Sequence, residues 1–290
     1  MAKLDPTLIN QVVTLQHKMP DHMVCDSHAD RKKLASDWLD EKRDNDRLDL
    51  MQRLLPLDIY AAKMLEIGSG VGTFLIAAHK RSITIDGLEP VLDLVNLSQQ
   101  RLESINAKNV TAQVGSAEKL PYPDNTYEIV TSFQVLEHVS DPKQVLNESL
   151  RVLRPGGYIY FVIPSYQTFW EGHYGIFWWP KLHRFPQLMK LYIRLMQRDP
   201  AYVDTLQFIT PGFLRETLSA SPYKNQIQSL GCQVWEERLS KGMPTWGYTK
   251  RLFQVVNIAR KLKLLSVVKI FGKHFEFYTP IILVCQKGEH

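Results

Sequence analysis

The sequence predicts an α/β fold in which a mainly parallel sheet is wound in both directions from its centre. An apolar segment, Met64–Ile67, runs into a glycine-rich turn at residues 68–72, and a helical pattern follows. A second apolar segment ends in an acid, Glu89, twenty-three residues after Glu66. Strand, glycine turn, helix, strand and acid is the order in which doubly wound sheets hold an adenosine-containing cofactor.

The other elements continue this alternation of helices and strands. Helical periodicity and stop signals predict helices at residues 71–80, 91–104, 142–154, 185–198, 211–218 and 250–270. Apolar alternation predicts strands at residues 64–67, 83–89, 110–114, 127–133, 158–160, 232–239 and 275–286. Residues 1–60 form a predicted N-terminal helical cap on a domain of residues 61–290. Two segments interrupt that domain as insertions, at residues 165–209 and 241–274.

The spacing of the glycines separates two classes of cofactor. In the dinucleotide fingerprint the third glycine lies three residues after the second, and the helix that follows binds a pyrophosphate. Here Gly68, Gly70 and Gly72 are each two residues apart, and Glu66 precedes the first by two. A carboxylate at this position would repel a pyrophosphate and attract an ammonium or sulfonium group, which argues against an NAD-dependent oxidoreductase.

This motif resembles motif I of the class I S-adenosylmethionine-dependent methyltransferases. Gly115–Tyr122 resembles the adenine loop of that family, Tyr127–Phe133 its fourth strand, and Gln134–Pro142 the segment that follows. Leu150–Tyr160 resembles its helix end and fifth strand. The resemblance implies a Rossmann-like, seven-stranded doubly wound sheet, S-adenosylmethionine as the cofactor, and methyl transfer as the activity.

The resemblance also implies which residues contact the cofactor. They are Glu66, Gly68, Gly70, Gly72, Glu89, Ser116, Ala117, Glu118 and Gln134. Glu66 would face the amino group of the methionine moiety, unless it is an ordinary surface acid. Glu89 can accept hydrogen bonds from both ribose hydroxyls, or act as a charge at a helix N-terminus. Ser116 stands where the family often has Asp, so a hydroxyl would replace a carboxylate at the adenine.

Two histidines are the candidate catalytic residues. His138 follows the fourth strand and could act as a general base near neutral pH, or form with Glu137 a structural pair that shapes the floor of the site. His173 lies beside Glu171 and Tyr174 in the first insertion, which is either a mobile lid or a packed aromatic loop. A base is needed only if the acceptor is a hydroxyl or a protonated amine.

Charge is distributed unevenly along the chain. Residues 238–275 contain nine Lys or Arg and no acid, so the net charge of +5 conceals a net of −4 elsewhere, from 26 basic and 30 acidic residues. Leu252, Val255 and Ile258 begin an apolar helical stripe in this block. Such a helix can lie on an anionic membrane, or can pack on its own protein with the basic face in solvent. No nucleic-acid motif accompanies the charge, so nucleic acid is not an expected partner.

The N-terminal residues lack the apolar core of a signal peptide, and no run of residues is apolar enough to span a membrane. Three distant cysteines, Cys25, Cys232 and Cys285, form neither a disulfide framework nor a metal-ligand spacing. We therefore expect a cytoplasmic protein without a bound metal, either free in the cytoplasm or peripheral at the inner face of a membrane.

The aromatic first insertion suggests the acceptor. Stacking of sugars on Trp and Tyr side chains would suit a glycan or a lipid-linked sugar as the O-methylation substrate. A small hydrophobic acceptor such as a quinone, lipid or natural product fits the same aromatic segment. A third possibility is a cofactor-binding, membrane-associated protein without catalysis.

Overall fold

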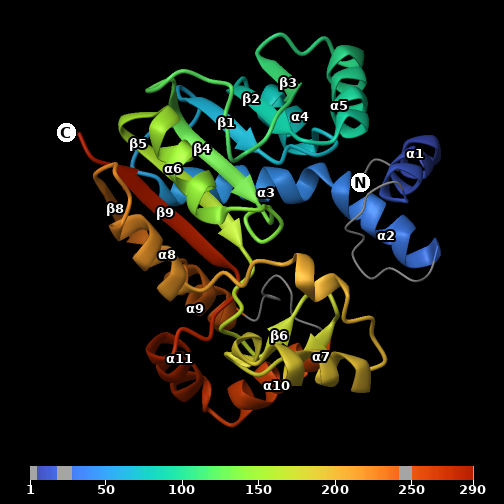
Figure 1. Cartoon of the computed structure of the whole chain (residues 1–290), viewed down its shortest axis with the longest axis vertical. Coiled ribbons are helices and arrows are strands. Elements are labelled where there is room, and N and C mark those ends of the chain that lie inside the picture. The colour runs from blue at the N-terminus through green and yellow to red at the C-terminus, as the bar shows by residue number, and fades with distance from the viewer. Residues whose placement is uncertain (1–4, 18–27, 242–249, 290) are drawn as a thin grey trace.

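A seven-stranded sheet runs through the centre of the molecule (Figure 1). The structure is a computed structural model that describes residues 5–17, 28–241 and 250–289. The strands of this sheet are β3 (Val110–Val114), β2 (Thr84–Glu89), β1 (Lys63–Ile67), β4 (Tyr127–Phe133), β5 (Leu153–Ile163), β9 (Ile281–Lys287) and β8 (Asn225–Ser229), in spatial order. Strands β1 to β5 are parallel, and β9 pairs antiparallel with both β5 and β8. The order confirms the predicted doubly wound, seven-stranded sheet.

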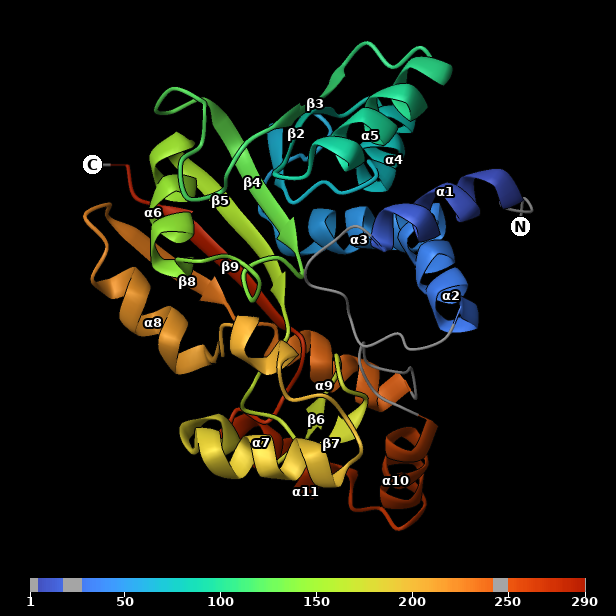
Figure 2. The same cartoon turned by 45° about the vertical axis from the view of Figure 1, so that its right-hand side comes forward.

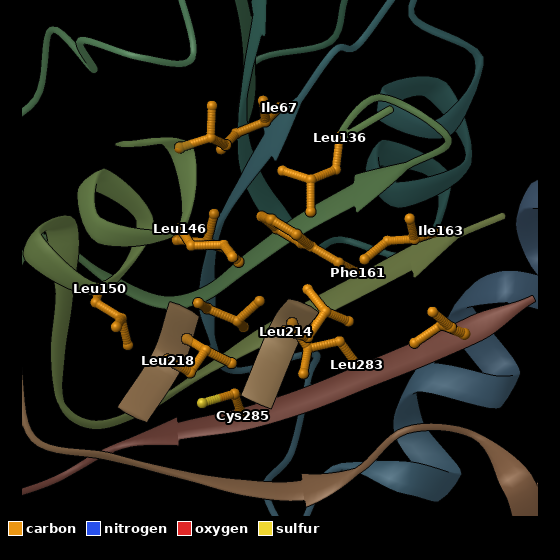
Figure 3. Packing of buried hydrophobic residues seen from close by; sticks show 14 of the residues in the cluster. Ile67, Leu136, Leu146, Leu150, Phe161, Ile163, Leu214, Leu218, Leu283 and Cys285 are labelled. Atoms are coloured by element: carbon orange, nitrogen blue, oxygen red, sulfur yellow. The ribbon is translucent and has the colours of Figure 1, made fainter. Parts of the chain in front are cut away.

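Helices cover both faces of the sheet. They are α3 (Glu41–Leu54), α4 (Thr73–Lys80), α5 (Leu92–Ser104), α6 (Pro142–Val152), α8 (Pro211–Ser219) and α9 (Cys232–Lys241). On one face, α6 and α8 pack against β4, β5 and β9, and Figure 3 shows Leu146 and Leu214 meeting Phe161 and Leu283 there. On the other face, α3, α4 and α5 pack on β1 and β2. Both faces of the central strands are therefore buried, which explains their continuous apolar runs.

The N-terminal region forms two further helices, α1 (Pro6–Gln16) and α2 (His28–Trp38). Val12 and Leu39 of this region pack with Val71 and Leu94, next to the glycine turn. Residues 18–27 of the predicted cap, which include Met19, lie outside the described residues. The cap thus rests on the edge of the sheet from which the glycine turn emerges.

The first insertion has a hydrophobic core of its own. It comprises β6 (Trp170–Glu171), β7 (Ile176–Phe177), the 3₁₀ helices η1 (Leu182–Arg184) and η2 (Tyr202–Thr205), and α7 (Pro186–Leu195). The second insertion contains α10 (Lys250–Lys261) and α11 (Leu265–His274), and residues 242–249 of it lie outside the described residues. Figures 1 and 2 both place α7, α10 and α11 at the end of the molecule opposite α4 and α5.

Several predicted element boundaries are wrong. Residues 232–239, expected as a strand, form helix α9, because helical spacing buries Val234, Trp235 and Leu239 together while alternation would also bury charges. The sixth strand is instead the polar edge strand β8, whose sequence has no apolar alternation to reveal it. The expected helix at 250–270 is two helices.

Two more boundaries differ near prolines. Helix α6 ends at Val152 and β5 begins at Leu153, so the Pro155–Gly157 segment lies inside the strand, where a register shift against β4 accommodates it. The last strand begins at Ile281 rather than at residue 275, directly after Pro280, which has no N–H to donate to a sheet.

We expect Gly72→Ala to destabilise the protein more than Gly175→Ala. Both glycines have positive φ, 75° and 64°, so each alanine carries strain of about 1–2 kcal/mol. A Cβ at residue 72 would also overlap the buried Ser98 side chain, whereas a Cβ at residue 175 meets nothing within 4 Å. Denaturant unfolding should show an additional loss of about 1–3 kcal/mol for Gly72→Ala. Equal losses of stability for the two variants would mean that Ser98 on α5 can move away from residue 72, at the start of α4, without cost.

Candidate functional site

A cavity of about 500 Å³ opens where the winding of the sheet reverses, between β1 and β4. This is the position at which doubly wound sheets bind ligands, and the volume suits a small molecule. The glycine turn and the ends of β1, β2 and β4 form its floor, and Trp38 and α3 close it from the cap. Tyr202 of the first insertion completes the wall.

The glycine turn is built for close approach of a ligand. Gly68 and Ser69 donate backbone hydrogen bonds to the Leu88 carbonyl oxygen, at 2.8 and 3.1 Å, which ties the turn to β2. Gly70 has a φ of 51°, and a Cβ there would meet nothing within 4 Å, so its backbone faces open space. A Cβ at Gly68 would overlap Val135. Gly72 precedes α4 and is not among the residues that line the cavity.

Unpaired polar atoms meet at one end of the cavity. Glu66 is buried, and its Oε2 makes no hydrogen bond within the described part of the chain. The Nε atoms of Arg43 and Arg47 on α3 are likewise buried and make no hydrogen bond there. Asp44 lies between them, 2.5 Å from the Arg47 guanidinium and 3.9 Å from Arg43 Nε. One acceptor and two donors without hydrogen bonds therefore belong to side chains that line the cavity, and they could bind an ammonium and a carboxylate group.

Burial raises the pKa of Glu66 well above its ordinary value, and the nearby acids Asp44 and Glu89 raise it further against the opposing charge of Arg47. A cation bound beside Glu66 would favour its ionised form. The carboxylate is thus costly without a ligand and is stabilised by a positively charged one.

Glu89 lies at the end of β2 and faces the same cavity. Its Oε2 accepts a hydrogen bond from the Gly70 N–H at 3.1 Å, and its Oε1 accepts one from Val91 N–H, also at 3.1 Å. Burial raises its pKa, and these two backbone bonds oppose the rise. In this structure Glu89 therefore braces the glycine turn and the start of α5, which matches the helix-terminus alternative and leaves its ribose contacts as a proposal.

The expected adenine loop lies outside the residues that line the cavity. Ser116 and Glu118 are hydrogen-bonded to each other, and Glu118 also accepts the Ser140 N–H at 2.9 Å. Ala117 is buried in the core beneath α6. Gln134, by contrast, does line the cavity, in a left-handed conformation with a φ of 59°.

A second polar cluster adjoins the cavity and joins both candidate histidines. His138 lines the cavity, and its ring lies 5.3 Å from that of His173, edge to face. His173 lies in the turn between β6 and β7, where its Nδ1 is 2.6 Å from Glu171 Oε1. The Gln207 N–H donates to the Glu137 carbonyl oxygen at 2.8 Å, which fastens the insertion to the segment after β4.

The two histidines have opposite electrostatic environments. Burial lowers the pKa of His138 to about 4, and the nearby His173 lowers it as well. Burial also disfavours the charged form of His173, but the hydrogen bond with Glu171 and the charges of Glu171 and Glu137 outweigh it and raise its pKa. Burial raises the pKa of Glu137 to about 7, against the charge of His173. A neutral imidazole is thus available at the cavity wall at neutral pH.

Arg43, Asp44 and Arg47 were not predicted as site residues. They lie on a helix whose sequence is highly charged throughout, so nothing distinguishes them from solvent-exposed residues. Their burial at 2% for Asp44 and 8% for Arg47 is the signal, and it appears only when α3 packs over the cavity.

Comparison with known proteins agrees with this fold. Residues 65–161 match the family model of a methyltransferase domain. An uncharacterised methyltransferase of Schizosaccharomyces pombe is 37% identical over 107 residues, which cover 33% of this chain and 38% of that protein. The chloroplastic 2-methyl-6-phytyl-1,4-hydroquinone methyltransferase 2 of Oryza sativa is 29% identical over 157 residues, 52% of this chain and 39% of that one.

Among solved structures, the YcgJ protein of Bacillus subtilis has a TM-score of 0.50 at 18% identity, covering 84% of this chain and 98% of its own. At that identity the likeness shows the fold alone. The chain spans about two fifths of the length of the curated relatives named above.

The sheet order, the glycine turn and the family match together define the class. Residues 65–161 are a methyltransferase domain by this match, and they lie on a sheet with the strand order that the sequence predicts for class I methyltransferases.

We expect Glu66→Gln to stabilise the free protein and weaken its binding of S-adenosylhomocysteine. The pKa of Glu66 is raised on folding. The free energy of unfolding of the parent protein should therefore fall as pH rises above the pKa of the unfolded chain, about 4.3, towards the higher pKa of the folded protein. The difference in Tm between Gln and Glu variants should therefore be absent at pH 4 and grow towards pH 8. Calorimetric titration at pH 8 should show at least tenfold weaker binding. A Gln variant that is less stable at pH 8, or binds equally well, would contradict this assignment.

Proposed function

We propose that this protein transfers the methyl group of S-adenosylmethionine to a small hydrophobic acceptor. The observation that carries the proposal is the cavity at the β1–β4 reversal, which is lined by Glu66, Arg43 and Arg47, each with a buried side-chain atom that makes no hydrogen bond within the described chain. An ammonium for the acid and a carboxylate for the arginines are the two charged groups of an amino-acid moiety. The bound cofactor supplies an activated methyl group, and the protein has to position the acceptor in line with it.

The remaining cofactor contacts are proposed from the same cavity. Gly68 and Gly70 allow the cofactor to approach the backbone, Glu89 accepts ribose hydroxyls, and Gln134 lies at the floor. Gly72 and residues 116–118 take part through the turn and the adenine loop, as the family resemblance implies. His138, at the cavity wall, and His173, behind it, are the proposed catalytic residues on the acceptor side.

The structure favours a hydrophobic acceptor over a sugar. Trp178 is fully buried, and Tyr166 and Tyr174 are buried with it in the core of the first insertion. These three rings are unavailable for stacking on a glycan, and the exposed Trp179 of the same insertion is not among the residues that line the cavity. The relative from Oryza sativa is a methyltransferase of a phytylated hydroquinone, a hydrophobic acceptor of the proposed kind.

The first test is titration with S-adenosylhomocysteine, followed by transfer of labelled methyl from S-adenosylmethionine to lipid and aqueous extracts. We expect micromolar binding, label in the lipid extract, and at least tenfold weaker binding for Glu89→Ala, which loses two hydrogen bonds to a charged group. Glu103→Ala, an exposed acid on α5, is the matched control and should bind normally.

Label confined to aqueous glycans would restore the sugar acceptor. Binding without transfer to any extract would support a non-catalytic cofactor-binding protein. No binding by the folded protein would refute the proposed function.

We further propose that the acceptor is met at an anionic membrane surface. None of the described helices is both long and apolar enough to cross a membrane. Most of the exposed large apolar side chains of the described chain nevertheless lie in two segments, 169–196 and 258–275. They are Phe169, Phe177, Trp179, Phe185, Leu188, Leu191, Leu195, Met196, Ile258, Leu262, Leu264, Val267, Ile270, Phe271 and Phe275, which we call the apolar end.

Two features indicate that the apolar end is one surface. Phe169 and Phe277 are in edge-to-face contact at 4.9 Å, and Gln167 donates to the Phe275 carbonyl oxygen at 2.8 Å, so the two segments adjoin. Helix α7 buries Met189 and Ile193 in the insertion core and exposes Leu188 and other leucines on its opposite side. A helix apolar on two sides needs a second apolar environment.

The charge of both segments favours an anionic surface. Residues 172–198 and 238–275 contain Lys and Arg but no Asp or Glu. Lys181, Arg184, Arg194, Lys261 and Lys273 are exposed among the apolar side chains. Apolar burial combined with attraction of basic residues to anionic headgroups is the pattern of interfacial binding. The stripe positions Leu252 and Val255 have side chains outside the described residues and carry none of this argument.

We expect the protein to float with phosphatidylglycerol vesicles and to float less with phosphatidylcholine vesicles or in high salt. The double variant Leu188→Asp/Ile270→Asp should reduce binding at least tenfold. Each change removes an exposed apolar side chain whose full burial in the membrane would contribute about 1.5–3 kcal/mol. Leu92→Asp alters an equally exposed leucine (59%) outside the apolar end and should bind like the parent protein. Flotation that is unaffected by the double variant would place the membrane contact elsewhere.

A further inference from the structure

The cluster behind the cavity contains a buried carboxylate that no hydrogen bond satisfies. Glu137 has 0% exposure, and neither of its side-chain oxygens has a hydrogen-bond partner in the described chain. Buried carboxylates are normally paired, hydrogen-bonded or bound to a metal. Leaving a buried polar group unsatisfied costs about 1–3 kcal/mol, and a charged group costs more. The closest approach of a titratable nitrogen is His138 Nε2, 3.8 Å from Glu137 Oε1.

The neighbouring side chains form a set of metal-ligand types. One ligand atom each from Glu137, His138 and His173 lies within 4.8 Å of the other two. Tetrahedral ligands at about 2.1 Å from a zinc ion lie about 3.4 Å apart, so small side-chain rotations would bring the three into range. Two imidazoles and one carboxylate, with a fourth position for water or substrate, are a ligand set of catalytic zinc sites.

Glu171 is positioned like the carboxylate that, in many zinc sites, hydrogen-bonds to the second ring nitrogen of a metal-bound histidine. Its Oε1 is 2.6 Å from His173 Nδ1, and its Oε2 accepts the Tyr174 N–H at 2.6 Å. Oε1 thus fixes the ring of His173, Oε2 fixes Glu171 to the backbone of the same turn, and Nε2 of His173 is the nitrogen left for a ligand. Metal-bound histidines usually have their second nitrogen held by a carboxylate or carbonyl in this way.

The side of the cluster that is open is the side of the cofactor cavity. The His138 side chain is 25% exposed and lines that cavity, whereas the His173 and Glu137 side chains are 6% and 0% exposed. An ion held by the three would be closed off by the first insertion and accessible only from the cavity, where an acceptor oxygen could become its fourth ligand.

We propose that Glu137, His138 and His173 bind one zinc ion beside the cofactor cavity. Binding of the ion depends only on this cluster. Its role, to bind and polarise an acceptor oxygen, rests on the proposed methyl transfer. The site joins the segment after β4 to the first insertion, so the ion would also hold that insertion against the domain.

The test is calorimetric titration of chelator-treated full-length protein with Zn²⁺, with bound metal counted by elemental analysis. We expect one ion per chain, at least 100-fold weaker binding for Glu137→Gln and for His173→Gln, and 10–100-fold weaker binding for Glu171→Gln. His183→Gln removes another partly buried histidine of the same insertion and should bind Zn²⁺ like the parent protein. Replacement by Co²⁺ should give a visible absorption band that Glu137→Gln lacks.

Binding of S-adenosylhomocysteine separates this proposal from the proposed function. Metal-free protein and each variant should still bind it, because Glu66 and Glu89 lie outside the cluster, and this shows that the variants are folded. Stoichiometric zinc without methyl transfer would support the site and refute the function. Full transfer with no zinc bound, or zinc bound equally by Glu137→Gln, would overturn the site and leave a proton-relay role for the histidines.

Discussion

The site depends on a carboxylate buried at the point where the winding of the sheet reverses. Glu66 belongs to β1, which pairs with β2 on one side and β4 on the other, so the fold itself removes it from solvent. Arg47 of α3, which is held by Asp44 and lies 4.2 Å above the Phe133 ring, opposes part of the cost of that charge, whereas Asp44 of the same helix adds to the cost. The helical cap is therefore part of the site, because α3 places both Arg47 and Asp44 close enough to Glu66 to shift its pKa.

The same problem of burying an acid recurs behind the cavity, with a different solution. Glu171 is matched by His173 through a short hydrogen bond, and that leaves Glu137 without a hydrogen-bond partner in the described chain. In the first cluster the compensation comes from arginines on the cap, and in the second it comes from histidines and, by our inference, a metal ion. Both clusters face the cavity, so the ligand that fills it alters the electrostatics of each.

The two insertions connect this chemistry to the outside of the molecule. The first insertion packs Trp178 and its neighbours into a separate core, and its Gln207 is hydrogen-bonded to Glu137 beside the cavity. The same segment exposes the leucines of α7 at the apolar end. A surface bound to lipid would thus lie on the element that carries His173, which places acceptor delivery and acceptor chemistry on one structural unit.

The sequence alone determined the domain class, because its signals are local. The glycine spacing at residues 68–72, the acid at Glu89 and the apolar strands around them require no knowledge of distant contacts, and the sheet order confirmed the fold that they predict. Local signals failed where packing decides, as at residues 232–239, which form a helix, and at the polar edge strand β8. Only the tertiary structure brought Arg43 and Arg47 to Glu66, and His173 to Glu137, since these pairs are joined by the docking of the cap and of an insertion rather than by any spacing in the chain.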